Sequence, residues 1–81
     1  MAQFFVKILI PDDTNFYKDK QLRLDLEKIL MRNHADYFDS YGGNPIYMVK
    51  QEVTASRIVH DINNLKSKIR ARELGVEELS R

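Results

Sequence analysis

The spacing of apolar residues in the last third of the chain predicts one long amphipathic helix from Val53 to Gly75. Its apolar side chains recur in steps of three and four, which places them on one face of a helix. Thr54 suits the N-cap position, and Gly75 suits the left-handed residue that commonly follows a helix. We expect the resulting apolar stripe to face the core: Ala55, Ile58, Ile62, Leu65 and Ile69.

The first residues of the chain alternate in a way that is typical of a strand. Residues 2–10, AQFFVKILI, are rich in side chains that suit a pleated sheet, and Pro11 ends the run. One face of this strand is wholly apolar, and the other carries Phe5, Lys7 and Leu9. Because helices packed on one side only would leave Phe5 and Leu9 half exposed, the pattern predicts a second layer or a partner.

The middle of the chain predicts a second helix and a β-hairpin. The helix covers residue 19 to residue 33 or 34, with Asp19 as its N-cap and leucine and isoleucine side chains along one side. The loop before it, residues 12–18, is expected to fold Phe16 and Tyr17 back as a plug. The hairpin arms are residues 37–41 and 46–52, joined by a four-residue turn of sequence GGNP.

These elements define the predicted fold and a predicted assembly. The order is β-α-β-β-α, an α+β arrangement with a three-stranded sheet and two helices packed on one face, and the 81 residues form a single domain. Pairing of the first strand with a second copy would cover Phe5, Leu9 and an open sheet edge together, so we predict a homodimer. The apolar stripe of the long helix offers a second route to the same assembly.

Composition narrows the classes of function. A net charge of +1 gives no global attraction to nucleic acid or to an anionic membrane. The chain has no cysteine, which excludes disulfides, thiol nucleophiles and cysteine-ligated zinc. The longest apolar run, FFVKILI, is interrupted by Lys7 and is too short to cross a bilayer, and no signal-peptide pattern is present. We therefore expect a cytoplasmic protein without membrane contact.

Candidate catalytic and metal-binding residues are sparse. His34, Asp36 and Asp39 form an H-x-D-x-x-D cluster whose side chains suit a divalent metal, but the spacing fits no established motif, and polar turn residues are the preferred interpretation. His60 faces away from the apolar stripe and is expected at the surface. We assign no catalytic residue, metal ligand or cofactor and expect a protein that is not an enzyme. An enzyme would need a pocket that gathers His34, Asp36 and nearby tyrosines.

The basic residues near the carboxyl end are the best signal for nucleic-acid binding. Four cations alternate in the sequence KSKIRAR, and residues 54–74 carry five positive and two negative charges. In a strand these four cations would form one row, but a helix turns alternate positions about 200° apart. The predicted helix therefore places Arg57, Lys68 and Arg72 together on one flank of the apolar stripe. Nucleic-acid binding along this flank is the alternative function.

The sequence thus predicts a non-enzymatic protein-binding module, acting as an accessory regulator or inhibitor by occupying the surface of a partner protein. Small proteins without site chemistry often have such roles, including those encoded by viruses and mobile elements. The preference for a protein partner depends on residues 54–74 being helical, with their cations bordering an apolar seam. An extended conformation there, or one open surface that gathers the cations, would favour nucleic acid instead.

Overall fold

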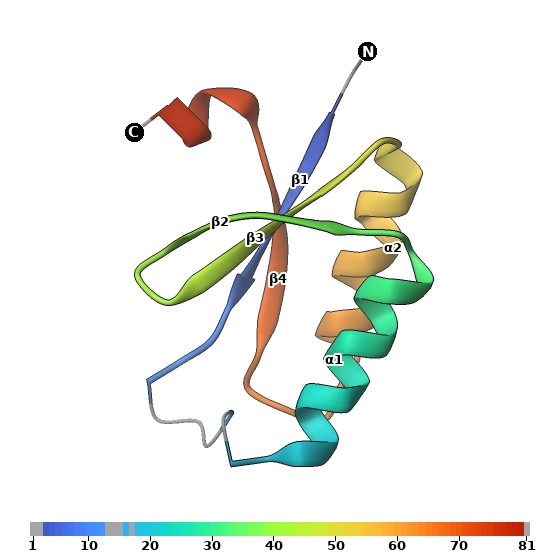
Figure 1. Ribbon diagram of the computed structural model, residues 1–81, viewed down its shortest axis with the longest axis vertical. Coiled ribbons are helices and arrows are strands. Elements are labelled where there is room, and N and C mark those ends of the chain that lie inside the picture. Colours follow the sequence, from blue (N-terminus) through green and yellow to red (C-terminus); the bar gives the residue numbers. More distant parts are fainter. Residues whose placement is uncertain (1–2, 13–15, 17, 81) are drawn as a thin grey trace.

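The computed structural model describes residues 3–12, 16 and 18–80, and its elements follow one another in the order β-α-β-β-α-β (Figure 1). Ala2 and Tyr17, which the sequence placed in the first strand and in the loop plug, lie outside the described residues. The elements are β1 (Phe4–Leu9), α1 (Lys20–Arg32), β2 (Asp36–Tyr41), β3 (Asn44–Val49), α2 (Glu52–Asn63), β4 (Arg70–Leu74) and the short 3-10 helix η1 (Val76–Ser80).

The strands form one sheet in the order β2-β3-β1-β4, and every neighbouring pair is antiparallel. Both helices lie on the same side of this sheet (Figure 1). The element order and strand order are those of the split βαβ, or ferredoxin-like, arrangement, which by itself carries no function. The predicted α+β class is confirmed, but the predicted three-stranded sheet is wrong, because β4 adds a fourth strand.

The fourth strand replaces the second half of the predicted long helix. Helix α2 ends at Asn63, and Asn64 is its C-cap, with a backbone N–H that donates to the carbonyl of His60. Asparagine is a poor helix former, and two in succession favour an end to the helix at this point. The predicted start is also wrong, because α2 begins at Glu52 with Gln51 as N-cap and Thr54 lies inside it.

The core lies between the helices and one face of the sheet. Val6 and Ile8 of β1 are fully buried there, as the alternation of the first strand predicted. The predicted stripe also faces inward: Ala55, Ile58 and Ile62 are buried on α2, and Ile69 is buried just before β4 although it is not helical. The rest of the buried cluster comes from α1, β3 and β4: Leu26, Ile29, Leu30, Val49 and Ala71.

The first helix and the hairpin follow the sequence more closely. Asp19 is the N-cap of α1, and its Oδ1 accepts from the backbone N–H of Leu22 at 3.0 Å. Phe16 packs against the core, as predicted for the loop plug. The hairpin turn, however, contains two residues, Gly42 and Gly43, because β3 already begins at Asn44. In the described part of the chain, no helix is both long and apolar enough to cross a membrane.

Candidate interaction surface

The sheet has one face that neither helix covers, which we call the open face. Side chains alternate along a strand, and opposed residues of antiparallel neighbours point to the same side. Because Val6 and Ile8 pack under the helices, the register assigns the following residues to the open face: Phe5, Lys7 and Leu9 from β1; Asp36, Phe38, Asp39 and Tyr41 from β2; Asn44, Ile46 and Met48 from β3; Arg70, Arg72 and Leu74 from β4.

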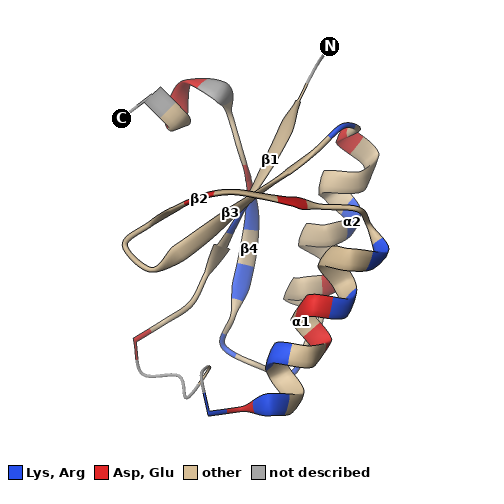
Figure 2. Cartoon of the chain, in the orientation of Figure 1, with Lys and Arg blue, Asp and Glu red and all other residues tan. Residues whose placement is uncertain are grey.

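The charges of the open face are separated by strand. Lys7 of β1 lies directly opposite Arg72 of β4, and Arg70 follows two residues earlier on the same side. The acidic side chains Asp36 and Asp39 lie on β2, at the other edge of the sheet. Figure 2 shows basic residues along β4 and acidic residues along β2. The open face is therefore cationic toward β4 and acidic toward β2.

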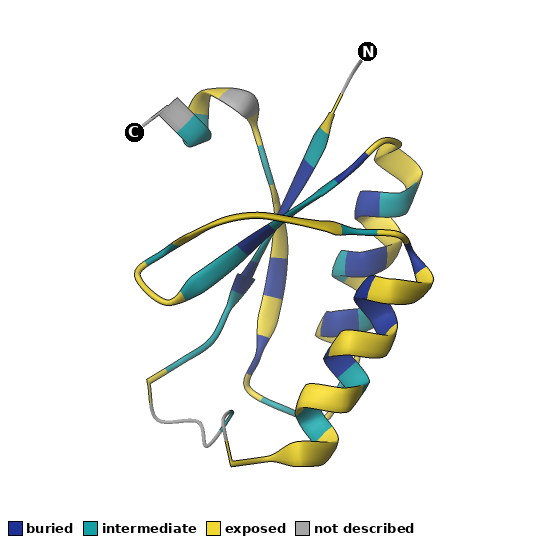
Figure 3. Cartoon of the chain, in the orientation of Figure 1, coloured by how far each residue is buried: buried dark blue, intermediate teal, exposed yellow. Residues whose placement is uncertain are grey.

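The centre of the open face is apolar and already covered in part. Phe5 is 5% exposed and Ile46 is fully buried, yet neither belongs to the core cluster beneath the helices. The Phe38 ring supplies some of the cover, with its centroid 4.9 Å from that of Phe5 in an edge-to-face arrangement. Phe38 itself remains 45% exposed, and β2 is the most exposed strand of the sheet (Figure 3).

The C-terminal 3-10 helix η1 contacts the open face at Tyr41 and Arg72. The Tyr41 hydroxyl donates to the carbonyl of Leu79 at 3.5 Å, and Arg72 Nη1 lies 3.3 Å from Glu78 Oε1. In Figure 1, η1 lies on the side of the sheet away from α1 and α2. Between η1 and the sheet is a pocket of about 410 Å³, lined by Lys7, Tyr41, Arg72, Leu74 and Glu78.

The three cations predicted to bind nucleic acid lie on different elements. Arg57 is exposed on α2, Lys68 is exposed in the loop before β4, and Arg72 lies on the open face of β4. The predicted helix flank is therefore wrong, because the helix ends at Asn63. The strand instead brings Arg72 together with Arg70 and Lys7, two cations that the predicted flank did not include.

The predicted route to a dimer through the edge of the first strand is also wrong. Strand β1 is paired with β3 on one side and with β4 on the other, so it has no free edge. Phe5 is buried within the single chain and needs no second copy to cover it, whereas Leu9 is half-buried. The homodimer itself stays a prediction, with Leu9 as the remaining residue of the proposed contact.

The structure does not bring His34, Asp36 and Asp39 together in one groove. His34 and Asp36 line a groove of about 540 Å³ between the end of α1 and the start of α2, but neither Asp39 nor any tyrosine lines it. Within residues 3–12, 16 and 18–80, no group of three or more histidine, aspartate or glutamate side chains could hold a metal ion. The groove thus gathers only part of the set that an enzyme would need.

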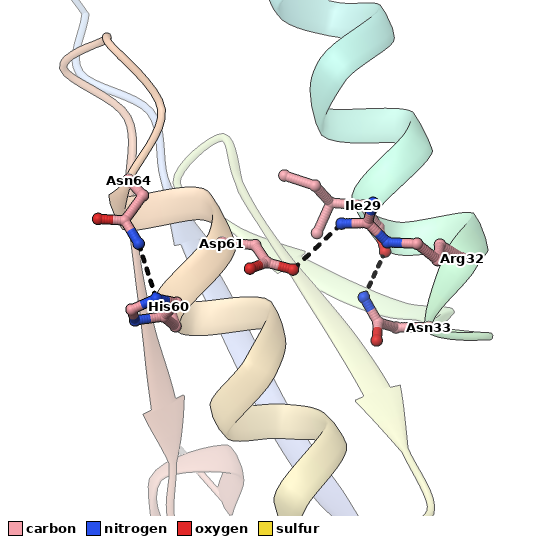
Figure 4. A network of polar contacts seen from close by, with 6 residues as sticks. All are labelled: Ile29, Arg32, Asn33, His60, Asp61 and Asn64. Carbon is pink, nitrogen blue, oxygen red and sulfur yellow. Dashed lines mark hydrogen bonds and ion pairs between the residues drawn. The ribbon is translucent and has the colours of Figure 1, made fainter.

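His60 and Asp61 have separate partners, shown in Figure 4. Exposed His60 pairs through Nε2 with Asn64 Nδ2 at 2.9 Å, as a surface histidine of α2. Asp61 Oδ2 instead accepts from Arg32 Nη2 at 3.1 Å and so joins α2 to α1. The predicted surface position of His60 is confirmed, and the two neighbours do not form an acid–histidine pair.

The pocket beside η1 contains residues that the sequence did not single out. Tyr41 and Glu78 reach it only because β2, β4 and η1 meet on one side of the sheet. The one sequence signal for this pocket was the alternation of Arg70 and Arg72, since alternate residues share a face in a strand. The signal applies only if residues 70–74 are extended, and the sequence pattern predicted a helix there.

Comparison with known proteins adds no relationship. No protein-family model matches the chain, and neither the curated proteins nor the solved structures give a match. Function is therefore inferred from the residues of the open face.

Proposed function

We propose that the protein is a non-enzymatic binding module whose open face binds an acidic partner protein. It regulates or inhibits this partner by occupying the partner's surface. The observation that carries this proposal is the composition of the face. Aromatic residues, methionine and arginine are enriched in protein interfaces, whereas lysine and aspartate are depleted. Besides the buried Phe5, the described residues of the open face include five of the enriched types and three of the depleted types, Lys7, Asp36 and Asp39. The five enriched residues are Phe38, Tyr41, Met48, Arg70 and Arg72.

The arrangement of these residues defines the partner's chemistry. Phe38 is a half-exposed aromatic side chain near the apolar centre and can serve as an anchor. Lys7 and Arg72 lie on the β4 side and favour carboxylates there. Opposite charges of this kind orient a partner and speed its association more than they raise its affinity. The proposed partner therefore presents an apolar contact flanked by acidic side chains.

Nucleic-acid binding is a second candidate, supported by the position of Arg70, Arg72 and Lys7 on one face. Residues 70–74 are extended, and in an extended strand alternating cations lie on one face, as nucleic-acid binding would require. The balance of charge weakens it, because the carboxylates of Asp36, Asp39 and Glu78 lie on the same side. Phosphate binding depends on the cations, so neighbouring carboxylates weaken it, whereas a protein partner also gains the apolar contact at Phe38. We therefore rank the acidic protein partner first.

Affinity capture with matched variants tests the proposal. The wild-type chain, Phe38→Ala and Met31→Ala are immobilised separately and exposed to an extract of the source cells. Met31 is the control because it is 67% exposed on α1, away from the open face. We expect an acidic protein to be retained by the wild type and Met31→Ala and lost from Phe38→Ala. Retention that ignores Phe38, or the absence of any retained protein, contradicts the proposal.

A titration with single-stranded RNA and DNA tests the second candidate. Binding that falls steeply between low and moderate salt, and that is weakened by Arg70→Ala, would establish nucleic acid as the ligand and contradict the ranking above.

Size-exclusion chromatography of the purified chain with light scattering tests the predicted homodimer. A mass near 9.6 kDa at high concentration would contradict the predicted homodimer.

A further inference from the structure

The pocket between η1 and the open face is lined by two cationic side chains, Lys7 and Arg72. Lys7 and Arg72 are opposed across β1 and β4 and point to the same side of the sheet. Like charges directly opposite one another destabilise a sheet unless an anion lies near them. The pocket also holds the Tyr41 side chain, whose hydroxyl faces the C-terminal 3-10 helix. These groups suit a ligand that carries a negative oxygen.

The chain supplies such an oxygen from its own C-terminal segment. Glu78 Oε1 lies 3.3 Å from Arg72 Nη1, and Glu78 Oε2 accepts from the backbone N–H of Gly75 at 2.9 Å. The side chains of this ion pair are 50% and 38% exposed, so water and salt reach both partners and weaken their attraction. An external carboxylate can therefore compete with Glu78 for the same guanidinium.

We infer that Lys7, Tyr41 and Arg72 form a binding site for an acidic peptide segment, and that η1 occupies this site in the free protein. The incoming segment places a carboxylate where Glu78 lies and an apolar residue where Leu79 lies. Leu79 is half-buried, and its carbonyl accepts from Tyr41, so the position after the acid already contacts the face. This inference rests on the proposed function, because it names the part of the partner that the open face recognises.

A peptide with the sequence of residues 75–80, GVEELS, is the direct probe, fluorescently labelled and capped at both ends. A tethered segment competes at a high effective concentration, so the wild-type chain should bind the added peptide poorly. Full-length Glu78→Gln loses the internal carboxylate, and we expect it to bind the peptide at least tenfold more tightly. Glu77→Gln is the matched control, because it removes the neighbouring charge and leaves the Glu78–Arg72 contact in place.

Two further arms show whether the carboxylate is recognised at the proposed site. The peptide GVQQLS should bind Glu78→Gln at least tenfold more weakly, and adding Lys7→Ala to Glu78→Gln should have a similar effect. The inference is overturned if Glu78→Gln binds no better than Glu77→Gln, if GVQQLS binds as well as GVEELS, or if Lys7→Ala changes nothing. Circular dichroism of each variant confirms that it is folded before binding is compared.

The two proposals fail in different ways. Loss of a partner from Phe38→Ala, together with no gain of peptide binding in Glu78→Gln, would keep the open face as the interface and reject the acidic segment. Peptide binding that depends on Lys7, together with a partner that ignores Phe38, would keep the pocket and reject the wider interface.

Discussion

The side-chain amide of Asn63 binds both backbone polar groups of Ala71. Asn63 Oδ1 accepts from the Ala71 N–H at 2.8 Å, and Asn63 Nδ2 donates to the Ala71 carbonyl at 3.1 Å. Ala71 is the second residue of β4, an edge strand whose outward backbone groups would otherwise be open to pairing with another chain. The last residue of α2 thus binds the outward backbone groups near the start of this edge and fixes where the strand lies against the helix.

We expect Asn63→Ala to lower the free energy of unfolding by about 1–3 kcal/mol, because it leaves two partly buried backbone groups without partners. Chemical denaturation measures this change. Asn64→Ala is the control, since Asn64 makes its side-chain contact with exposed His60 and should matter little. Equal losses for the two variants would show that the Asn63–Ala71 contact does not stabilise β4.

The spacing of apolar residues did not predict the fourth strand. The steps from Ile62 to Leu65 and from Leu65 to Ile69 fit a helix, and Ile69 does reach the core. It does so from an extended segment, because the chain turns after Asn64 and returns beside β1. Local spacing reports which residues are buried, but not whether the chain folds back. The contact between Asn63 and Ala71 depends on that return.

The residues of the open face could be predicted from the sequence only in part. The alternation of β1 correctly placed Val6 and Ile8 beneath the helices and Phe5 and Lys7 on the other face. The partner of Lys7 could not be predicted, because strand register depends on tertiary pairing and a shift of one residue exchanges the two faces. The sequence pattern therefore could not predict that Lys7 and Arg72 lie opposite one another.

His34 offers a test of backbone strain at the end of α1. Its φ is +55°, and it occupies the left-handed position at which helices commonly carry glycine. The bonds from Ala35 N–H to the Leu30 carbonyl and from His34 N–H to the Met31 carbonyl complete a Schellman motif. We expect His34→Gly to stabilise the protein by up to about 1 kcal/mol, because relief of strain exceeds the added flexibility of the unfolded chain.

The control for this prediction is His34→Ala, which keeps a Cβ atom and should give no gain in the same thermal and chemical denaturation measurements. If His34→Gly also gives no gain, then the left-handed conformation costs the folded protein little. Both variants remove the imidazole, so the comparison isolates the backbone.

The raised pKa of Tyr47 predicts how the stability of the protein depends on pH. Burial raises the pKa of Tyr47 above 10.0, and the charges of Tyr37 and Glu27 raise it further. The neutral phenol is favoured in the folded state, so its contribution to stability is complete below pH 10 and is lost as pH rises through the folded pKa. We expect the wild type to lose more free energy of unfolding than Tyr47→Phe between pH 9 and pH 12, measured by urea denaturation. Equal losses would contradict the assignment.

The hairpin turn gives a prediction in which sterics and backbone conformation can be separated. Gly42 and Gly43 have φ values of +60° and +81°, and a Cβ atom at either position would meet nothing within 4 Å. Two left-handed residues in a two-residue hairpin are typical of a type I′ turn, which prefers asparagine followed by glycine. We expect Gly43→Ala to cost about 1–2 kcal/mol through strain alone, and Gly42→Asn to be tolerated.

Gly75→Ala is the matched control for this turn, because the φ of Gly75 lies outside the left-handed region. A Cβ atom there would lie 2.8 Å from Glu77 Oε1, the end of a flexible exposed side chain that can move aside at little cost. Thermal denaturation should therefore rank Gly43→Ala well below Gly75→Ala in stability. The opposite order would mean that the turn adapts to a side chain and that the conformation of Gly43 does not fix the register between β2 and β3.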